Sequence, residues 1–277
     1  MFSNRLVPSA AVLCVTLAVG ATACGSSGST KASSPASAAA PASAAAPASP
    51  SASPSPSGLD VSTLSADDIL DKAHTAMSSI TSMRMAGNIT TDGQKTVMDL
   101  RADKDKNCAG TVTVGATGSV EIIHNASGTW MKPDAAFWQN VSAQEGHASA
   151  GPAVAKMFSG KYLTGAQDDQ NFKDMASMCD MISGIAGDNS KPDSATKAAP
   201  TTINGQGAIE IDTKDQDGPG SVYIATQGAP YLLRMTSTGS EPGQFDLSEF
   251  NKPLSIQAPP ADQVINYSDF QKKVQSV

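Results

Sequence analysis

The cysteines carry the clearest chemistry in this sequence. Cys24 directly follows three small residues (21–23, Ala-Thr-Ala), and upstream lie Arg5 and an apolar run over residues 10–19. This order is typical of a bacterial lipoprotein signal, in which the cysteine thiol accepts a diacylglyceryl group and a peptidase cuts the preceding bond. We therefore predict a signal peptide over residues 1–23 and a lipid anchor, palmitate included, on Cys24. The alternative is an ordinary signal peptide that happens to end beside a cysteine.

A second pair of cysteines lies in the part of the chain that remains after export. Cys108 and Cys179 have no CxxC spacing and no histidine near them in sequence, which argues against a metal or redox pair. Two cysteines in an oxidising exterior most simply form one disulfide. It would close a loop of about 70 residues and stabilise the domain by roughly 4 kcal/mol.

Signatures of catalysis are missing. The sequence contains no GxSxG, HExxH, P-loop or GxGxxG motif, and His74, His124 and His147 are far apart and share no spacing with carboxylates. Residues 215–218 (Asp-Gln-Asp-Gly) faintly resemble the start of a calcium loop, but Thr226 stands where its closing Glu belongs. We expect a protein that is not an enzyme and that needs no cofactor and no metal. A hydrolase assembled from residues distant in sequence remains an alternative.

Composition limits the class of partner. The 277 residues carry a net charge of −7, and their 19 Lys and Arg form no basic block, so we expect no nucleic acid partner. No stretch in the mature chain reaches 18 apolar residues. Residues 25–57 are Ala, Ser and Pro with four exceptions, a composition that has no apolar pattern to bury. We predict a lipidated cysteine and disordered linker over 24–57 and a folded domain over 58–277, held on the extracytoplasmic face of the cell membrane.

The periodicity of the domain predicts one helix, then strands, a helical insert and more strands. Residues 64–79 follow a 3.6-residue period, and Ser65 can cap that helix. Alternating patterns with turn residues between them predict antiparallel hairpins on both sides of the insert. The fold class we expect is α+β. The strands are expected at 83–89, 96–100, 112–114, 120–122, 128–132, 208–213, 221–226, 231–236 and 244–249, and the insert helices at 134–141, 150–158 and 170–185.

Methionine is the distinctive residue of this domain. Several of its methionines fall on one face of the first two predicted strands, and others lie in the insert helices. Methionine is flexible and polarisable, so it lines pockets that accept varied apolar ligands and also fills ordinary cores. With Trp130, Phe137 and Trp138, these residues predict an apolar cleft between sheet and helices, or else a closed core, because both are apolar inside. The methionines are Met77, Met83, Met85, Met98, Met131, Met157, Met175, Met178, Met181 and Met235.

Four stretches carry a family resemblance. Residues 108–123 (CAGTVTVGATGSVEII), 134–138 (DAAFW), 223–231 (YIATQGAPY) and 258–264 (APPADQV) resemble actinobacterial lipoproteins of the LppX/LprG group, which is similar in fold to the LolA and LolB lipoprotein carriers. The resemblance implies a curved antiparallel half-barrel sheet with helices packed in its concave face and a hydrophobic cavity between them. It also implies that the cavity binds an acylated lipid or another amphipathic small molecule.

Carried to this sequence, the resemblance implies a set of residues that line the ligand cavity. Their assignment depends on strand parity, because a one-residue slip exchanges the two faces of a strand. A sensory or protein-interaction lipoprotein, with an envelope protein as partner and no lipid cargo, is the alternative function. The expected lining residues are Met83, Met85, Met98, Leu100, Val112, Val114, Val120, Ile122, Trp130, Phe137, Trp138, Val222, Ile224, Leu233 and Met235.

Overall fold

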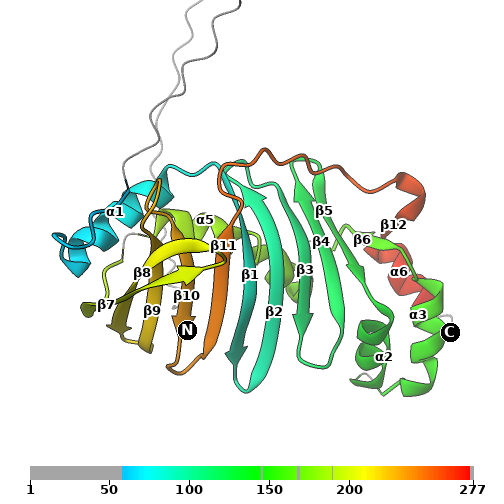
Figure 1. The fold of residues 1–277 in the computed structure, drawn as a ribbon. Helices are drawn as coiled ribbons and strands as arrows, with labels where there is room; N and C mark the ends of the chain where they lie inside the picture. The colour runs from blue at the N-terminus through cyan, green and yellow to red at the C-terminus, as the bar shows by residue number, and fades with distance from the viewer. Residues whose placement is uncertain (1–57, 145, 167–168, 189, 275–277) are drawn as a thin grey trace, which may run out of the picture. The chain divides into compact units, whose positions relative to one another are not determined.

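The computed structural model describes residues 58–144, 146–166, 169–188 and 190–274 (Figure 1). The leader, Cys24 and the linker predicted from the sequence lie outside the described residues. No helix in the described ranges is long and apolar enough to cross a bilayer.

Helix α1 (Ala66–Ser78) begins where the sequence predicts it to begin. The Ser65 side chain accepts a hydrogen bond from the backbone N–H of Asp68, and the Asp68 carboxylate accepts one from the backbone N–H of Ser65. This capping box satisfies N–H groups that the first helical turn leaves unpaired. Ile69, Ala73 and Met77 are the buried residues of the helix. The first two pack against Ile209, Ile211 and Ile224, so α1 covers the later strands of the sheet.

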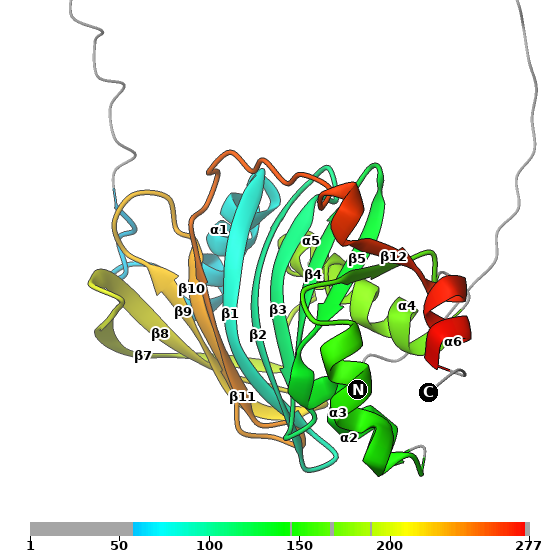
Figure 2. The same ribbon diagram turned by 90° about the vertical axis from the view of Figure 1, so that its right-hand side faces the viewer.

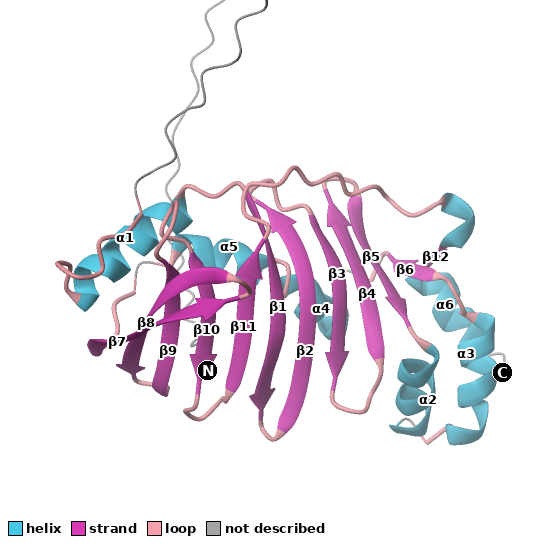
Figure 3. Cartoon of the chain, in the orientation of Figure 1, coloured by secondary structure: helices cyan, strands magenta, loops and turns pink. Residues whose placement is uncertain are grey.

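Five antiparallel strands follow α1 and form the first half of the sheet (Figure 3). The β1–β2 hairpin turns at Asp92 and Gly93, whose φ angles of 52° and 76° lie in the left-handed region. An Asp-Gly pair suits such a two-residue turn, and it makes this hairpin recognisable in the sequence. These strands are β1 (Ser82–Thr91), β2 (Gln94–Asp103), β3 (Cys108–Val114), β4 (Ser119–Asn125) and β5 (Gly128–Pro133).

The helical insert differs in detail from the prediction. The segment predicted as one helix over 170–185 forms two helices, with Met178 and Cys179 between them. A short strand, β6 (Tyr162–Thr164), was not predicted, because three residues are too few to show a period. The helices are α2 (Ala135–Gln144), the 3-10 turn η1 (Ala148–Ala150), α3 (Gly151–Met157), α4 (Gln170–Ser177) and α5 (Asp180–Gly187).

The second half of the sheet adds five antiparallel strands and a C-terminal unit. β7 (Ser194–Ile203) was not predicted: it lies at an edge of the sheet, is mostly exposed, and shows a register shift between Lys197 and Pro200. The remaining elements are β8 (Gln206–Asp215), β9 (Gly218–Ala225), β10 (Leu232–Ser237), β11 (Gly243–Ser248), the 3-10 turn η2 (Ala261–Gln263), β12 (Val264–Asn266) and α6 (Tyr267–Val274). β12 and α6 were also missed by the sequence analysis.

All twelve strands belong to one open, curved sheet. Their order is β12-β6-β5-β4-β3-β2-β1-β11-β10-β9-β8-β7, so β1 joins the two halves by pairing with β11. Only β12 and β6 pair in parallel among the described strands. Helices α1, α4 and α5 lie on one face of the sheet (Figure 2). The fold class predicted from the sequence, α+β with a curved antiparallel sheet and helices on its concave face, is confirmed.

A disulfide joins Cys108 on β3 to Cys179 at the start of α5, with Cα atoms 5.7 Å apart. Both residues are buried, and both belong to the core between the sheet and the insert helices. The pairing predicted from the sequence is thus present. It connects the insert to the concave face of the sheet at a point 71 residues away along the chain.

Candidate functional site

The concave face of the first sheet half is a continuous apolar surface. Antiparallel register places Met85 opposite Leu100 on one side and Leu247 on the other, and the same row continues through Gly110 to Ile122 and Met131. A second row runs from Phe245 through Gly87, Met98, Val112 and Val120. All side chains of the two rows belong to one core cluster, and none is more than 7% exposed.

Gly87 shows how closely this surface is built. A Cβ atom at Gly87 would lie 2.7 Å from the Cα of Phe245 and 2.8 Å from its Cδ1. The absence of a side chain at Gly87 therefore leaves the room that the Phe245 ring occupies. We expect Gly87 to tolerate no larger residue without displacement of β11.

Helices α4 and α5 cover this surface. Phe172 on α4 is buried in the core, while Met175, Met178 and Ile185 are half-buried and pack against it. The Cys108–Cys179 disulfide lies within the same contact. Residues 170–187, which form α4 and α5, are called the cover below. The sheet and the cover meet through flexible thioether side chains, which repack at low cost when a neighbour changes shape.

Most of the residues expected to line a cavity lie on this face. Met83, Met85, Met98, Leu100, Val112, Val120 and Ile122 are in the core cluster, and Val114, Phe137 and Met235 pack against it. Val222 and Ile224 also lie on this side of the sheet, but under α1, in a separate cluster with Ile69 and Ile211. Trp138 belongs to a third cluster, with Val154 and Phe158 between α2, α3 and β6.

Two of the expected lining residues face the other way. Trp130 pairs with Ile123, whereas its neighbour Met131 pairs with the buried Ile122, so Met131 takes the inward position and Trp130 the outward one. The prediction placed Trp130 on the wrong face because β5 is short and its pattern, Gly-Thr-Trp-Met-Lys-Pro, gives no parity of its own.

Leu233 is the second expected lining residue that lies on the outer face. The register of β10 against β9 shifts between Leu232 and Arg234. Leu232 therefore packs on the helix side, while Leu233 packs with Ile203, Ala208 and Ala225 on the outer side. A bulge adds one residue to a strand and reverses the parity beyond it, which an alternating pattern cannot reveal when two leucines are adjacent.

Three residues that were not predicted to line a cavity complete the surface. Phe245 and Leu247 lie at alternate positions of a strand that was predicted, and Met131 was counted among the methionines but not assigned to a face. The alternation Gln-Phe-Asp-Leu-Ser in β11 was the signal that could have identified the first two.

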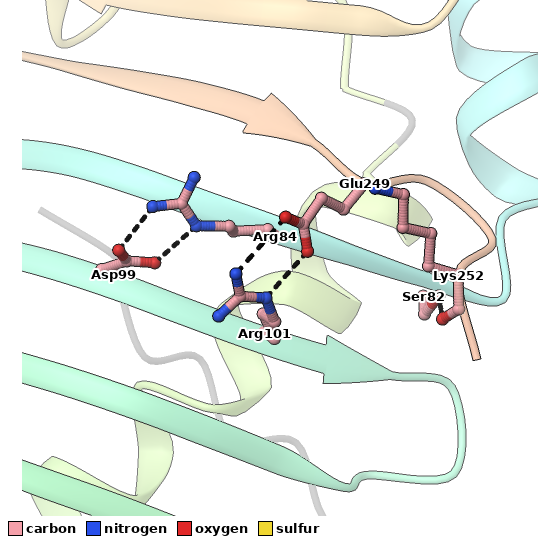
Figure 4. Close-up of polar contacts among 6 residues, drawn as sticks. All are labelled: Ser82, Arg84, Asp99, Arg101, Glu249 and Lys252. Carbon is pink, nitrogen blue, oxygen red and sulfur yellow. Dashed lines mark hydrogen bonds and ion pairs between the residues drawn. The ribbon is translucent and has the colours of Figure 1, made fainter. Parts of the chain in front are cut away.

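The outer face of the same strands carries paired charges. Arg84 on β1 donates to both oxygens of Asp99 on β2, with 2.7 Å between its Nε and Oδ1 (Figure 4). Arg234 on β10 pairs in the same way with Asp246 on β11, with 2.8 Å between Nη2 and Oδ2. In each pair the hydrogen bond from the guanidinium holds the pKa of the aspartate below its usual value.

A third bidentate pair fixes the chain after β11. Arg101 at the end of β2 donates to Glu249, with 2.8 Å between Nε and Oε2 and 3.3 Å between Nη2 and Oε1 (Figure 4). Further along the sheet, Tyr162 donates to Glu121 at 2.6 Å, and Lys132 lies 3.2 Å from the tyrosine hydroxyl. Burial raises the pKa of Glu121, but hydrogen bonds from Lys132 and Tyr162 outweigh it and lower that pKa overall. Glu121, Lys132 and Tyr162 thus form hydrogen bonds and an ion pair with one another.

Two hollows open on the described part of the domain, one beside α6 and one beside the start of β1. One, of about 350 Å³, is lined by Gly165, Ala166, Asp169, Tyr267, Ser268 and Gln271. The other, of about 160 Å³, is lined by Ser82, Met83, Arg101, Glu249, Lys252, Pro253 and Leu254. Met83 is the one expected lining residue that borders either hollow, so the side chains of the concave face pack against the cover rather than around these two spaces.

The arrangement offers apolar contact and no assembled metal-binding group. Within the ranges that the structure describes, no cluster of three or more His, Cys, Asp or Glu side chains could hold a metal ion. The concave face instead presents methionine, branched aliphatic and phenylalanine side chains under a pair of short helices. The fold and this surface define an α+β protein whose curved antiparallel sheet holds helices against an apolar concave face.

Comparison with known proteins adds structural neighbours of low identity. No protein-family model matches the sequence, and no curated protein is significantly similar to it. Among solved structures, LprF from Mycobacterium bovis is 13% identical over 71% of this chain and 97% of its own, with a TM-score of 0.49. The lipoprotein LppX of Mycobacterium tuberculosis is 16% identical over 68% and 96%, with a TM-score of 0.41.

A LolA superfamily protein, NE2245 from Nitrosomonas europaea, is 10% identical over 72% of this chain and 96% of its own, with a TM-score of 0.19. The chain is thus similar to members of the group that its sequence resembles.

Proposed function

We propose that this protein is an exported lipoprotein, anchored through Cys24, whose domain binds an acylated lipid or another amphipathic molecule between the concave face of the sheet and helices α4 and α5. The proposal assigns it no catalytic step. The single observation that carries it is the apolar concave face, rich in methionine and covered by two short helices. Each methylene buried there would contribute about 0.8 kcal/mol to binding, so an acyl chain would bind without specific polar contacts.

Binding would require the cover to move. In the described residues the side chains of the concave face are closed against α4 and α5, and Met85 and Leu100 are fully buried. Met175 and Met178 on the cover are half-buried and unbranched, so they can rotate aside without a large rearrangement of the backbone. The disulfide would keep the start of α5 attached to β3 while the rest of the cover shifts.

The same closed surface supports a second candidate function. If the core stays filled in solution, the domain is a sensory or protein-interaction lipoprotein whose partner is another envelope protein. The two functions predict different results for the purified protein: a lipid-binding domain retains a bound lipid, whereas a protein-interaction domain contains none.

The test is native mass spectrometry of the full chain purified from its own envelope, with the domain released by cleavage in the linker after purification. We expect an added mass of lipid size, recovered by organic extraction. The Met175→Arg variant should lose this mass, because it places a charge under the cover, while Val97→Arg, at an exposed position on the outer face, should keep it. A mass without lipid, unchanged after incubation with envelope lipids, would contradict lipid binding and favour the second function.

The anchor has its own test. Cys24→Ser removes the thiol that would be acylated, so we expect the protein to move from the membrane fraction to the medium. Fractionation followed by immunodetection measures this. Full retention in the membrane would contradict the anchor without bearing on the lipid site.

A further inference from the structure

The last eleven described residues form a separate arm. β12 (Val264–Asn266) and α6 (Tyr267–Val274) follow a strap, residues 249–263, that begins at the end of β11. Seven strand spacings separate β11 from β12 in the sheet, which amounts to about 34 Å. Figure 1 shows the strap crossing the ends of the intervening strands before the arm reaches β6. The arm therefore docks far from the strand that precedes it in the chain.

The surface that receives the arm, called the seat here, consists of the edge of β6 and the rings of Trp138 and Phe158. β12 pairs in parallel with β6, with Ile265 opposite Leu163 and Asn266 opposite Thr164. The Phe270 ring of α6 packs against Trp138 and Phe158, with centroid distances of 5.1 and 4.8 Å. The seat thus has the two parts that an incoming strand and amphipathic helix need: a strand edge and an aromatic cluster.

One further contact ties the arm to the start of the cover. The Tyr267 hydroxyl donates to Asp169, the residue that caps α4, at 2.9 Å. Tyr267 packs against both the concave core and the aromatic cluster.

The strap is held at intervals and leaves β11 through a strained turn. The turn is held by the Arg101–Glu249 pair, by hydrogen bonds of the Asn251 side chain with the Thr81 N–H and the Tyr231 hydroxyl, and by stacking of Phe250 on Tyr231. Further along, the Lys252, Ile256 and Asp262 carbonyls accept hydrogen bonds from Ser82 Oγ, Asn125 and Lys161. Glu249 and Asn251 have φ angles of 56° and 59°. Asparagine adopts this left-handed conformation readily, but a glutamate rarely does, so Glu249 marks a place where the turn stores conformational energy.

The seat also leaves one polar group unpaired. Trp138 is 5% exposed, and its indole Nε1 is buried without a hydrogen-bond partner. Because the Phe270 ring lies against Trp138, departure of α6 would let water reach the indole. This gain offsets part of the apolar contact that is lost when the arm leaves.

We infer that the seat of one copy of this protein accepts the β12–α6 arm of a second copy, so that two chains exchange arms. The occupant is a second copy because its arm carries the same side chains that fit the seat. Every contact between arm and seat is then remade, and the balance depends on the relief of the strained turn and on protein concentration. Tethering of both copies to one membrane would raise that concentration.

The exchange is tested with two variants of the full chain, each of which carries one added cysteine. Asn266 and Thr164 are direct partners across β12 and β6, at a spacing that a disulfide can bridge. Pairing of β12 of one chain with β6 of the other brings Thr164→Cys in one copy next to Asn266→Cys in another, differently tagged copy, and yields more covalent dimer than chance collision does. The two are co-expressed in one envelope, oxidised, and analysed by non-reducing electrophoresis and mass spectrometry.

Two controls define the baseline. Thr164→Cys co-expressed with Val97→Cys, an exposed position on the outer face, measures chance collisions. The double variant Thr164→Cys, Asn266→Cys on one chain measures the pairing within a chain. We expect at least tenfold more covalent dimer from the test pair than from the collision control. Dimer at the collision level would overturn the exchange, and so would a double variant that forms a disulfide neither within nor between chains.

A variant of the turn tests the cause. Glu249→Gly removes the strain at this position, because glycine adopts a positive φ angle readily. Glu249→Gln keeps the strain, and both variants remove the same charge. The glycine variant should trap several-fold less dimer than the glutamine variant. Equal trapping in the two variants would contradict the part assigned to strain.

Discussion

The two faces of the first sheet half use the same strands for opposite purposes. On β2, Met98 and Leu100 point into the concave core, whereas Val97, Asp99 and Arg101 point outward. The inner face packs through apolar side chains, while on the outer face Arg84 and Arg101 form bidentate pairs with carboxylates. In this half of the sheet the inner face therefore offers apolar contact, and the outer face carries charge pairs that link neighbouring segments.

The largest expected effect separates two neighbours on β2. Leu100→Arg would bury an unpaired charge at a position with no exposure and should lower the free energy of unfolding by about 4 kcal/mol or more. Val97→Arg, at 43% exposure, should change it by less than about 0.5 kcal/mol. Denaturant unfolding followed by circular dichroism measures both. Similar losses in the two variants would contradict the division into an inner and an outer face.

The next effect concerns the attachment of the cover to the inner face. Cys108→Ser and Cys179→Ser should each lower the free energy of unfolding by roughly 4 kcal/mol, because the disulfide closes a loop of 71 residues. The double variant should be no less stable than either single variant, since all three lose the same bond. Additive losses would indicate that the two cysteines act independently.

A smaller effect sharpens the electrostatics of the outer face. The folded pKa of Asp246 is lowered by Arg234, so the stabilisation from this pair is present above the ordinary aspartate pKa and is lost as the pH falls through the folded value. Asp246→Asn should cost about 1 kcal/mol at pH 7 and progressively less below pH 4. A difference between variant and parent that does not shrink in acid would show that the pair acts by packing rather than by charge.

The smallest effect is expected at Arg101. Its pair with Glu249 is exposed on both sides, so solvent and salt screen it. Arg101→Gln should leave the midpoint of denaturation unchanged within error at physiological ionic strength. A clear shift of the midpoint would show that the start of the strap contributes to global stability.

Sequence reasoning recovered those parts of the fold that depend on local signals. The Ser65 cap of α1, the turn between β1 and β2 and the alternation in β1 to β4 each involve residues within a few positions of one another. It failed at β12 and α6, whose partners lie far away in the chain, and at β7, an exposed edge strand that forms a hairpin with β8 and shows a register shift. It also misplaced Trp130 and Leu233, because a short strand and a bulge remove the information on parity.

Periodicity and composition are properties of the chain, and they were sufficient to predict the class of fold, the pairing of Cys108 with Cys179 and the apolar character of one sheet face. The folded domain was needed to show which residues form that face, that α4 and α5 close over it, and that the C-terminal arm docks on β6 across the width of the first sheet half. The physical reason is that register, bulges and long-range docking are chosen by the packing of distant segments, and a linear pattern specifies only what each segment could bury.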